Sequence, residues 1–314
     1  MKAAFGKVWK LEDQGGSIIG GTIKGLRAAQ ANPAAPWPSD LPKPKGQTVA
    51  SFRRGLATFP EGLAAKLGPE RVVTSWALTG VERAADGTYQ LSYDTPAGAQ
   101  TVSARAVIFT LPAHAAAPLL RLPAPPAADA LDSFYYPPVG AVTVAYPESA
   151  IREDRLAVGG GKMAGFGQLH PRSQGIVTLG TIYSSALFPN RAPPGQVLLL
   201  NYIGGAKNTG IATQKVEDIV AQVDKDLRIM LLRPDAPPPR VLGVRVWPRA
   251  IPQFNVGHLD VMAKARDALA TRGWSGAFLG GNYAAGVALG RCVEGAYESA
   301  AEVAAWLAAS PAAR

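Results

Sequence analysis

The spacing of hydrophobic residues changes from helical to strand-like along the first third of the chain. Residues 48–67 carry apolar side chains at helical spacing, and Gly68 followed by Pro69 predicts the end of that helix. Residues 71–112 contain three alternating or β-branched runs, separated by turn residues at 86–87 and 96–98, and predict a β-meander. The last run, AVIFT at 106–110, is apolar throughout and is typical of a strand that is covered on both faces.

A second strand-rich segment follows, and one helix interrupts it. The runs VGAVTVAYP, GIVTLGTIYSS, QVLLLNYIG and VLGVRVW predict strands, and residues 214–232 predict a helix. The chain then returns to a strand at 277–279, a glycine turn at 280–282 and a helix that begins between 286 and 289. This order predicts an α/β (α+β) fold in which a discontinuous nucleotide-binding domain encloses an inserted mixed-sheet substrate domain.

The N-terminal part of the chain carries weaker signals. Residues 5–26 mix a helix-like entry with Gly15, Gly16, Gly20 and Gly21, and residues 32–45 hold five prolines. Because proline disfavours regular structure in itself and in the residue before it, we expect 32–45 to be an exposed, extended connection.

Composition narrows the class of protein. A hydrophobic content of 47% and a charged content of 18% are typical of a globular chain. The net charge of +9 comes from scattered residues and not from a basic block, so we expect no nucleic-acid binding. A basic surface suits an anionic membrane face or a substrate that bears carboxylates. No apolar run approaches the ~20 residues that span a bilayer.

The residues that usually bind metals are sparse. The single Cys292 excludes a disulfide framework within the chain, and we expect it to be a packing residue. The histidines His114, His170 and His258 have no metal-like spacing, so no metal site is predicted. For His258, in VGHLD, a structural or hydrogen-bonding role is expected before that of a catalytic base.

Candidate chemistry concentrates in AFLGGNYAAGVALGRCVEGAYESAA at 277–301. A helix N-terminus presents free N–H groups and a partial positive charge. Small residues before and at the start of this helix leave room for a flat or phosphorylated ligand to lie against the backbone. The segment therefore predicts a ligand contact at the start of the last helix.

This segment resembles the flavin-contact segment of the FAD-dependent amine oxidase superfamily, and its sequence is similar to that of the plastid-type protoporphyrinogen oxidases. Further blocks are similar to the same family, in the family's order. They are FGKVWKLEDQGGSIIGGTIKG, LPKPKGQTVASFRRGL, FYYPPVGAVTVAYP, GFGQLHPRSQG, LGTIYSSALFPNRAPPGQVLLLNYIGGA and LGVRVWPRAIPQFNVGHLD. The resemblance implies that 1–44 belongs to a substrate or membrane-side region, 45–118 and 255–314 to the FAD-binding domain, and 119–254 to the substrate-binding domain.

The resemblance also implies a set of site residues. It places the adenine of FAD against the backbone of Val73, with Val72 as a near alternative, in a strand formed by RVVTSW. It implies no catalytic acid–base pair, because the flavin carries the chemistry. The remaining flavin contacts implied are Asn282, Val287, Ala288 and Leu289, and the implied tetrapyrrole contacts are Gly165, Phe166, Tyr183, Trp247 and Gln253.

The glycine-rich pyrophosphate turn of a flavin domain is not found in the sequence. The nearest candidate, 159–161, is followed by Gly165-Phe166-Gly167 and not by a helix, so we expect a loop. In the family this fingerprint lies upstream of FGKVWKLED. We therefore expect this chain to be the C-terminal portion of a longer enzyme, lacking the N-terminal βαβ unit of its nucleotide domain.

The activity implied is the oxidation of protoporphyrinogen IX to protoporphyrin IX by FAD and dioxygen, with hydrogen peroxide as by-product, in haem and chlorophyll synthesis. The resemblance to the plastid-type enzymes implies a chloroplast protein that is peripheral on the thylakoid or envelope membrane. A homodimer is compatible with this resemblance. Two alternatives stay open. One is another FAD-dependent oxidoreductase, such as an amine oxidase or a carotenoid desaturase, and the other is a catalytically incomplete fragment.

Overall fold

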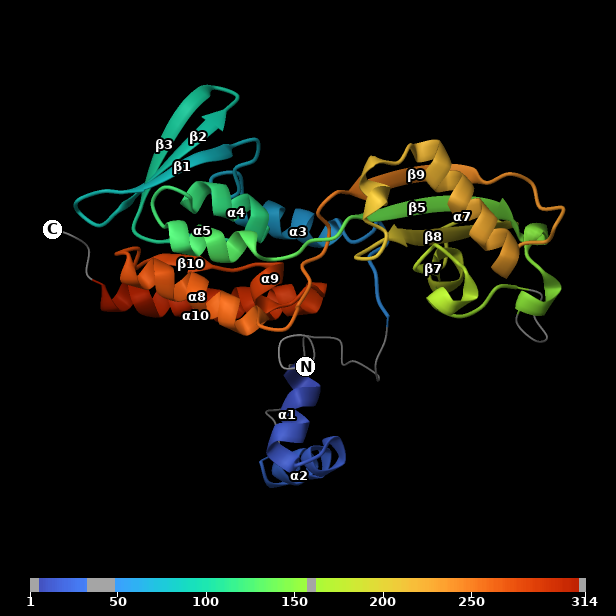
Figure 1. Ribbon diagram of the computed structural model, residues 1–314, viewed down its shortest axis with the longest axis horizontal. Helices are drawn as coiled ribbons and strands as arrows, with labels where there is room; N and C mark the ends of the chain where they lie inside the picture. Colours follow the sequence, from blue (N-terminus) through green and yellow to red (C-terminus); the bar gives the residue numbers. More distant parts are fainter. Residues whose placement is uncertain (1–5, 33–48, 157–161, 311–314) are drawn as a thin grey trace. The chain divides into compact units, whose positions relative to one another are not determined.

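The chain forms two compact units in the computed structural model, which describes residues 6–32, 49–156 and 162–310 (Figure 1). Unit 1 takes residues 1–134 and 254–314, and unit 2 takes 135–253. The mixed α/β fold class is confirmed. The inserted unit begins later than the expected 119, because α5 (Pro125–Asp132) packs against α4 and α8 of unit 1.

Unit 1 contains a three-stranded antiparallel meander, as the sequence predicted, and a separate parallel pair of strands, β4 and β10. Alanine-rich faces on α4 and α5 are fully buried, which lets the helices pack closely. The elements of unit 1 are α1 (Gly6–Gly15), α2 (Ile18–Ala31), α3 (Thr58–Leu67), β1 (Ala77–Arg83), β2 (Tyr89–Thr95), β3 (Gly98–Ala104), β4 (Val107–Phe109), α4 (Ala113–Leu120), α5, α8 (His258–Thr271), β10 (Ala277–Leu279), α9 (Asn282–Ala285) and α10 (Leu289–Ala309).

Three local expectations for unit 1 need correction. The helix expected over 48–67 begins only at Thr58. The strand expected at RVVTSW begins only at Ala77, so Val72 and Val73 lie outside it. Ile108 of β4 is 39% exposed, so within the described residues this strand is not covered on both faces.

The N-terminal segment forms a helical hairpin of α1 and α2. The two helices approach closely because glycines lie between them: a Cβ at Gly21 would lie 2.0 Å from the carbonyl oxygen of Leu11. Ser17 caps α2 by accepting a hydrogen bond from the amide of Gly20 at 2.9 Å. The expected proline-rich connection at 32–45 and the expected loop at 159–161 lie outside the described residues, apart from Asn32.

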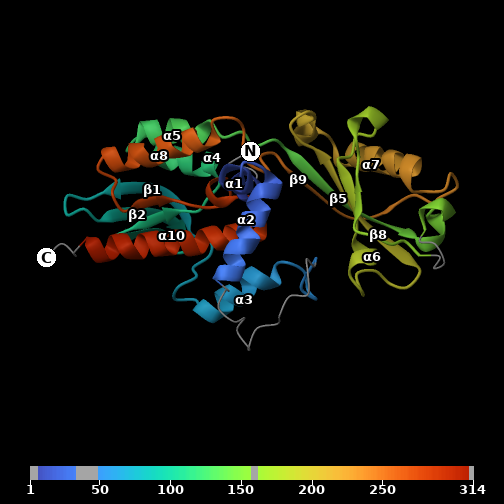
Figure 2. The same ribbon diagram turned by 90° about the horizontal axis from the view of Figure 1, so that it is seen from below.

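Unit 2 is a five-stranded antiparallel sheet, in the order β6-β7-β8-β5-β9, with α7 along one face (Figure 2). Alternate residues of β5 and β8 are buried against α7, and this period-two burial follows from the alternation in the sequence. The elements of unit 2 are β5 (Val139–Pro147), β6 (Gly167–Leu169), β7 (Gly180–Tyr183), α6 (Ser184–Leu187), β8 (Gln196–Gly204), α7 (Val216–Met230) and β9 (Arg240–Trp247).

No helix in the described part of the chain has the length and apolar character needed to cross a membrane.

Candidate functional site

A tight turn links β10, which pairs in parallel with β4, to the short helix α9. Phe109 accepts a hydrogen bond from the amide of Gly280 at 3.0 Å, which extends the pairing by one residue. Gly281 follows with φ +93° and ψ −168°, a conformation open essentially only to glycine. A Cβ at Gly281 would also lie 2.8 Å from the carbonyl oxygen of Thr110. The turn predicted from the glycines is therefore present. The short helix α9 that follows it was not predicted from the sequence.

His258 holds α9 in place from the first turn of α8. Its Nε2 lies 2.9 Å from the carbonyl oxygen of Tyr283, and its ring packs 4.9 Å from Phe134 and 4.2 Å from Phe254. A carbonyl can only accept, so Nε2 carries the proton. Burial lowers the pKa of His258, against the smaller opposing effect of the bond to Tyr283. The imidazole is therefore a neutral hydrogen-bonding group, the kind of role expected for it.

Two side chains of α10 tie back the loop that precedes this helix. Arg291 donates from Nε to the carbonyl of Ala285 at 3.2 Å and also pairs with Glu294. Cys292 donates from Sγ to the carbonyl of Gly286 at 3.3 Å. Arg291 is not among the site residues predicted from the sequence, and only its position in the first turn of α10, directly after the loop, could have indicated this contact.

The N-terminus of α10 is open. Ala288 is the N-cap residue and makes no side-chain cap, and the first-turn amide of Cys292 already bonds to the Ala288 carbonyl. The amides at 289–291 therefore have no intrahelical acceptor. Val287 and Leu289 are 46% and 50% exposed. An uncapped helix start between small and half-exposed apolar residues fits the polar edge and flat face of a flavin ring.

The other implied cofactor residues have a different setting. Asn282 is the first residue of α9, and its carbonyl accepts from the amide of Gly286 at 3.2 Å. Val72 uses its amide on the Gly68 carbonyl at 3.0 Å, just after α3. Val73 is 54% exposed, so it is accessible to a ligand and is not a residue of a core strand.

Tyr183 and Phe166 lie together in unit 2. The amide of Tyr183 donates to the carbonyl of Phe166 at 3.0 Å. The Tyr183 hydroxyl donates to Oε1 of Gln168 at 2.8 Å, and burial raises the pKa of this phenol. Its side chain is only 9% exposed and belongs to the core beneath α7. Phe166 is 52% exposed, and Gly165 before it has φ +101°. Of these three residues, Phe166 is the one with an accessible aromatic face.

Trp247 leaves the sheet on the face opposite to Tyr183. Trp247 pairs with Val139, whereas the residues of β5 that pack on α7 are Val142 and Val144, which have the other parity. It is 43% exposed, and the guanidinium of Arg245 lies 5.9 Å from its ring. Gln253 donates from its side chain to the carbonyl of Ile251 at 3.1 Å. The five implied substrate residues therefore do not form one cluster within unit 2.

Comparison with known proteins gives a family and close relatives. Residues 1–307 match the family model described as flavin containing amine oxidoreductase. The chain is 57% identical over 307 residues to the chloroplastic protoporphyrinogen oxidase of Nicotiana tabacum and 58% identical over 307 residues to that of Oryza sativa subsp. japonica, which in each case is 98% of this chain. It spans about half of those relatives, 56% and 57% of their lengths.

The fold is also found in solved structures. A putative protoporphyrinogen oxidase from Exiguobacterium sp. 255-15 superposes with a TM-score of 0.65 at 20% identity, over 96% of this chain and 58% of that one. At this identity the likeness concerns the fold alone.

Proposed function

Because this chain belongs to the flavin containing amine oxidoreductase family, we propose that it provides flavin contacts and the substrate unit for the oxidation of protoporphyrinogen IX by dioxygen. One observation carries the proposal: identity of 57–58%, over 98% of this chain, to relatives named chloroplastic protoporphyrinogen oxidase. The family is flavin-containing, which agrees with the cofactor FAD. The product is protoporphyrin IX.

The open start of α10 supports the cofactor part of the proposal. The amides at 289–291 would donate to the polar edge of the ring, and Ala288 and Val287 would lie against its face. His258, Arg291 and Cys292 hold the preceding loop, so these donors keep a fixed direction. Asn282 would contribute from α9, and the backbone of Val73 or Val72 would meet the adenine.

When bound, FAD supplies the hydride acceptor and passes two electrons to dioxygen, giving hydrogen peroxide; three such oxidations complete the conversion. The protein's part is to bind and orient the macrocycle. Phe166 offers an exposed ring for stacking, and Gly165 leaves space beside it. Tyr183 is buried and would support Phe166 indirectly, since its amide donates to the Phe166 carbonyl and its hydroxyl donates to Gln168. Trp247, on the opposite face of the sheet, and Gln253, in the segment after β9, would be further substrate contacts.

The cellular setting is part of the same proposal. The curated relatives quoted above are named chloroplastic, and we assign this chain to the chloroplast on that basis. A net charge of +9 supports a peripheral position on an anionic thylakoid or envelope membrane, and also attraction of the substrate's carboxylates.

Titration of the purified chain with FAD, followed by quenching of flavin fluorescence, tests the cofactor contacts. Saturable binding is expected, and Ala288→Leu should weaken it by about tenfold or more, because added methyl groups block close approach to the helix start. Ala296→Leu is the matched control, since Ala296 is also exposed on α10 but lies beyond its first two turns. Equal affinities of the two variants would contradict the assignment of the α10 start.

The same titration decides between the enzyme and the incomplete fragment. The sequence contains no glycine fingerprint for a pyrophosphate, and this is the observation on which the incomplete-fragment alternative rests. If the wild-type chain binds FAD, porphyrinogen oxidation is then assayed directly with oxygen uptake. If a folded chain, checked by circular dichroism, binds no FAD, the activity requires residues that this chain does not contain.

A further inference from the structure

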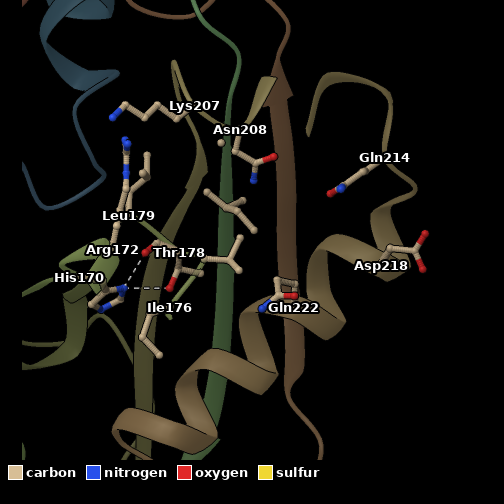
Figure 3. A pocket seen from close by; sticks show the side chains of 13 residues that line it. His170, Arg172, Ile176, Thr178, Leu179, Lys207, Asn208, Gln214, Asp218 and Gln222 are labelled. Carbon is tan, nitrogen blue, oxygen red and sulfur yellow. Dashed lines mark hydrogen bonds between the residues drawn. The ribbon is translucent and has the colours of Figure 1, made fainter. Parts of the chain in front are cut away.

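Unit 2 contains a cavity of about 470 Å³ that none of the proposed flavin or tetrapyrrole residues lines (Figure 3). This volume lies in the range of small-molecule sites, ~300–1,000 Å³. Its polar walls come from Arg172, Lys207, Asn208, Gln214, Asp218 and Gln222. Its floor is apolar, with Ile176 and Ile203 among its residues.

A buried carboxylate fixes the wall of the cavity. Asp226 of α7 is 1% exposed, and its Oδ2 accepts from the amides of Val177 and Thr178 at 3.1 and 2.7 Å. Its Oδ1 accepts from Nε2 of Gln222 at 2.8 Å, which fixes that cavity-lining amide. The segment before β7 and the helix α7 are therefore joined directly behind the cavity.

His170 is held in a defined tautomer on the same wall. Its Nδ1 lies 3.0 Å from the carbonyl oxygen of Thr178 and 2.9 Å from the Thr178 hydroxyl, and its Nε2 lies 3.1 Å from Nε2 of Gln168. A carbonyl accepts and an amide NH₂ donates, so Nδ1 carries the proton and Nε2 accepts. These hydrogen bonds fix the orientation of the imidazole ring in the wall of the cavity.

Two cations converge on one rim. Figure 3 shows Arg172 and Lys207 extending toward the same side of the cavity, away from Asp218, Gln214 and Gln222. Neither cation has an ion pair with any carboxylate in the described residues. Both sit on turns closed by backbone hydrogen bonds: Arg172 accepts from the amide of Gly175 at 3.1 Å, and the turn of Lys207 is closed from Asn208 to Gly205 at 3.1 Å.

We propose that this cavity binds a small organic anion whose carboxylate or phosphate group lies between Arg172 and Lys207. Arg172 and Lys207 are exposed and have no carboxylate partner in the described residues, so an anion would complete them, and a guanidinium matches the geometry of both oxyanions. The amides of Gln214 and Gln222 and the carboxylate of Asp218 face the other end of the ligand, which must carry hydroxyl or amino groups there. None of the residues proposed for the flavin or the tetrapyrrole lines this cavity, so the proposal does not depend on them.

The test is a titration of the whole chain with two probes, inorganic phosphate and citrate, at constant ionic strength, by calorimetry and by amide NMR. Saturable binding of one probe or both is expected, with shifts confined to 170–179, 204–208 and 214–222. The two probes distinguish a phosphate ligand from a carboxylate ligand. Arg172→Gln and Lys207→Gln should each weaken binding by about tenfold.

The matched control carries the same loss of charge elsewhere in unit 2. Lys225 and Arg240 are exposed, lie outside the cavity lining and form no ion pair within the described part of the chain. Lys225→Gln and Arg240→Gln should each leave the affinity within twofold. Absence of saturable binding for both probes overturns the proposal. An equal loss in either control variant also overturns it, because the binding would then follow net charge and not this cavity.

Discussion

Removal of the Asp226 carboxylate tests whether its hydrogen bonds to backbone amides and to Gln222 stabilise unit 2. Asp226 accepts three hydrogen bonds, from the amides of Val177 and Thr178 and from the side chain of Gln222. Thr178 is 1% exposed, so Asp226→Ala would leave its amide without water or another acceptor, whereas Val177 is 40% exposed and can be solvated. One lost charge-assisted bond to a buried donor, with smaller losses at the other two, gives about 3 kcal/mol of destabilisation.

Asp226→Asn separates the hydrogen bonds from the charge. The Asn carbonyl oxygen can still accept from both backbone amides, and Gln222 can rotate its amide to accept from the new NH₂ group. We therefore expect a loss of only about 1 kcal/mol, the difference between charged and neutral acceptors. Asp218→Ala, an exposed change in the first turn of α7, is the control and should cost about 0.5 kcal/mol.

The assay is native-state hydrogen exchange of amides in β7 and α7, because a chain of two units does not guarantee a single unfolding transition. Protection in both elements should fall together in Asp226→Ala, while β1–β3 in unit 1 remain unchanged. A loss below about 0.5 kcal/mol in Asp226→Ala, or equal losses in the Ala and Asn variants, would refute the reasoning.

Three further outcomes are expected. The pKa of His258 is lowered in the folded state, so below pH 6.5 the unfolded chain binds more protons than the folded one. The free energy of unfolding should therefore fall as pH falls, by up to about 1.4 kcal/mol per pH unit, until the folded pKa is passed. Urea midpoints measured against pH should lose this slope in His258→Gln. Gly281→Ala should destabilise by about 2–4 kcal/mol in thermal unfolding, while Gly243→Ala, where an added Cβ meets nothing, should have little effect. Tyr183→Phe should cost about 1 kcal/mol in urea unfolding through the lost bond to Gln168, and an unchanged midpoint would show that this bond contributes nothing.

The strands of unit 2 could be predicted because burial alternates along them. β5 and β8 begin and end where the apolar runs 139–147 and 196–204 do, since each second residue faces α7. The start of α10 was predicted for a similar local reason, since small residues precede its apolar face. Local pattern therefore fixed the elements that carry strong periodicity.

The contacts that hold the candidate sites could not be predicted in this way. Asp226 looks like one more polar residue of an amphipathic helix, yet it is buried because amides some fifty positions earlier point at it. Val72 and Val73 have strand-like composition, but the chain there follows the Gly68 cap and remains outside the sheet. Trp247 and Tyr183 were grouped by resemblance, and only the register of the sheet separates their faces.

The discontinuity of unit 1 has a consequence for the order of folding. The β4–β10 pair joins residues 107–109 to 277–279, so all of unit 2 lies within the loop that this pairing closes. Within unit 2 the first and last residues are already neighbours, since Gln253 donates its amide to the Tyr135 carbonyl at 2.9 Å. A folded unit 2 therefore removes residues 135–253 from that loop and leaves only 110–134 and 254–276 to be closed, and closing a shorter loop costs less chain entropy than closing a longer one. The antiparallel insert is thus expected to fold first, so that the two halves of unit 1 are joined through a shorter effective chain.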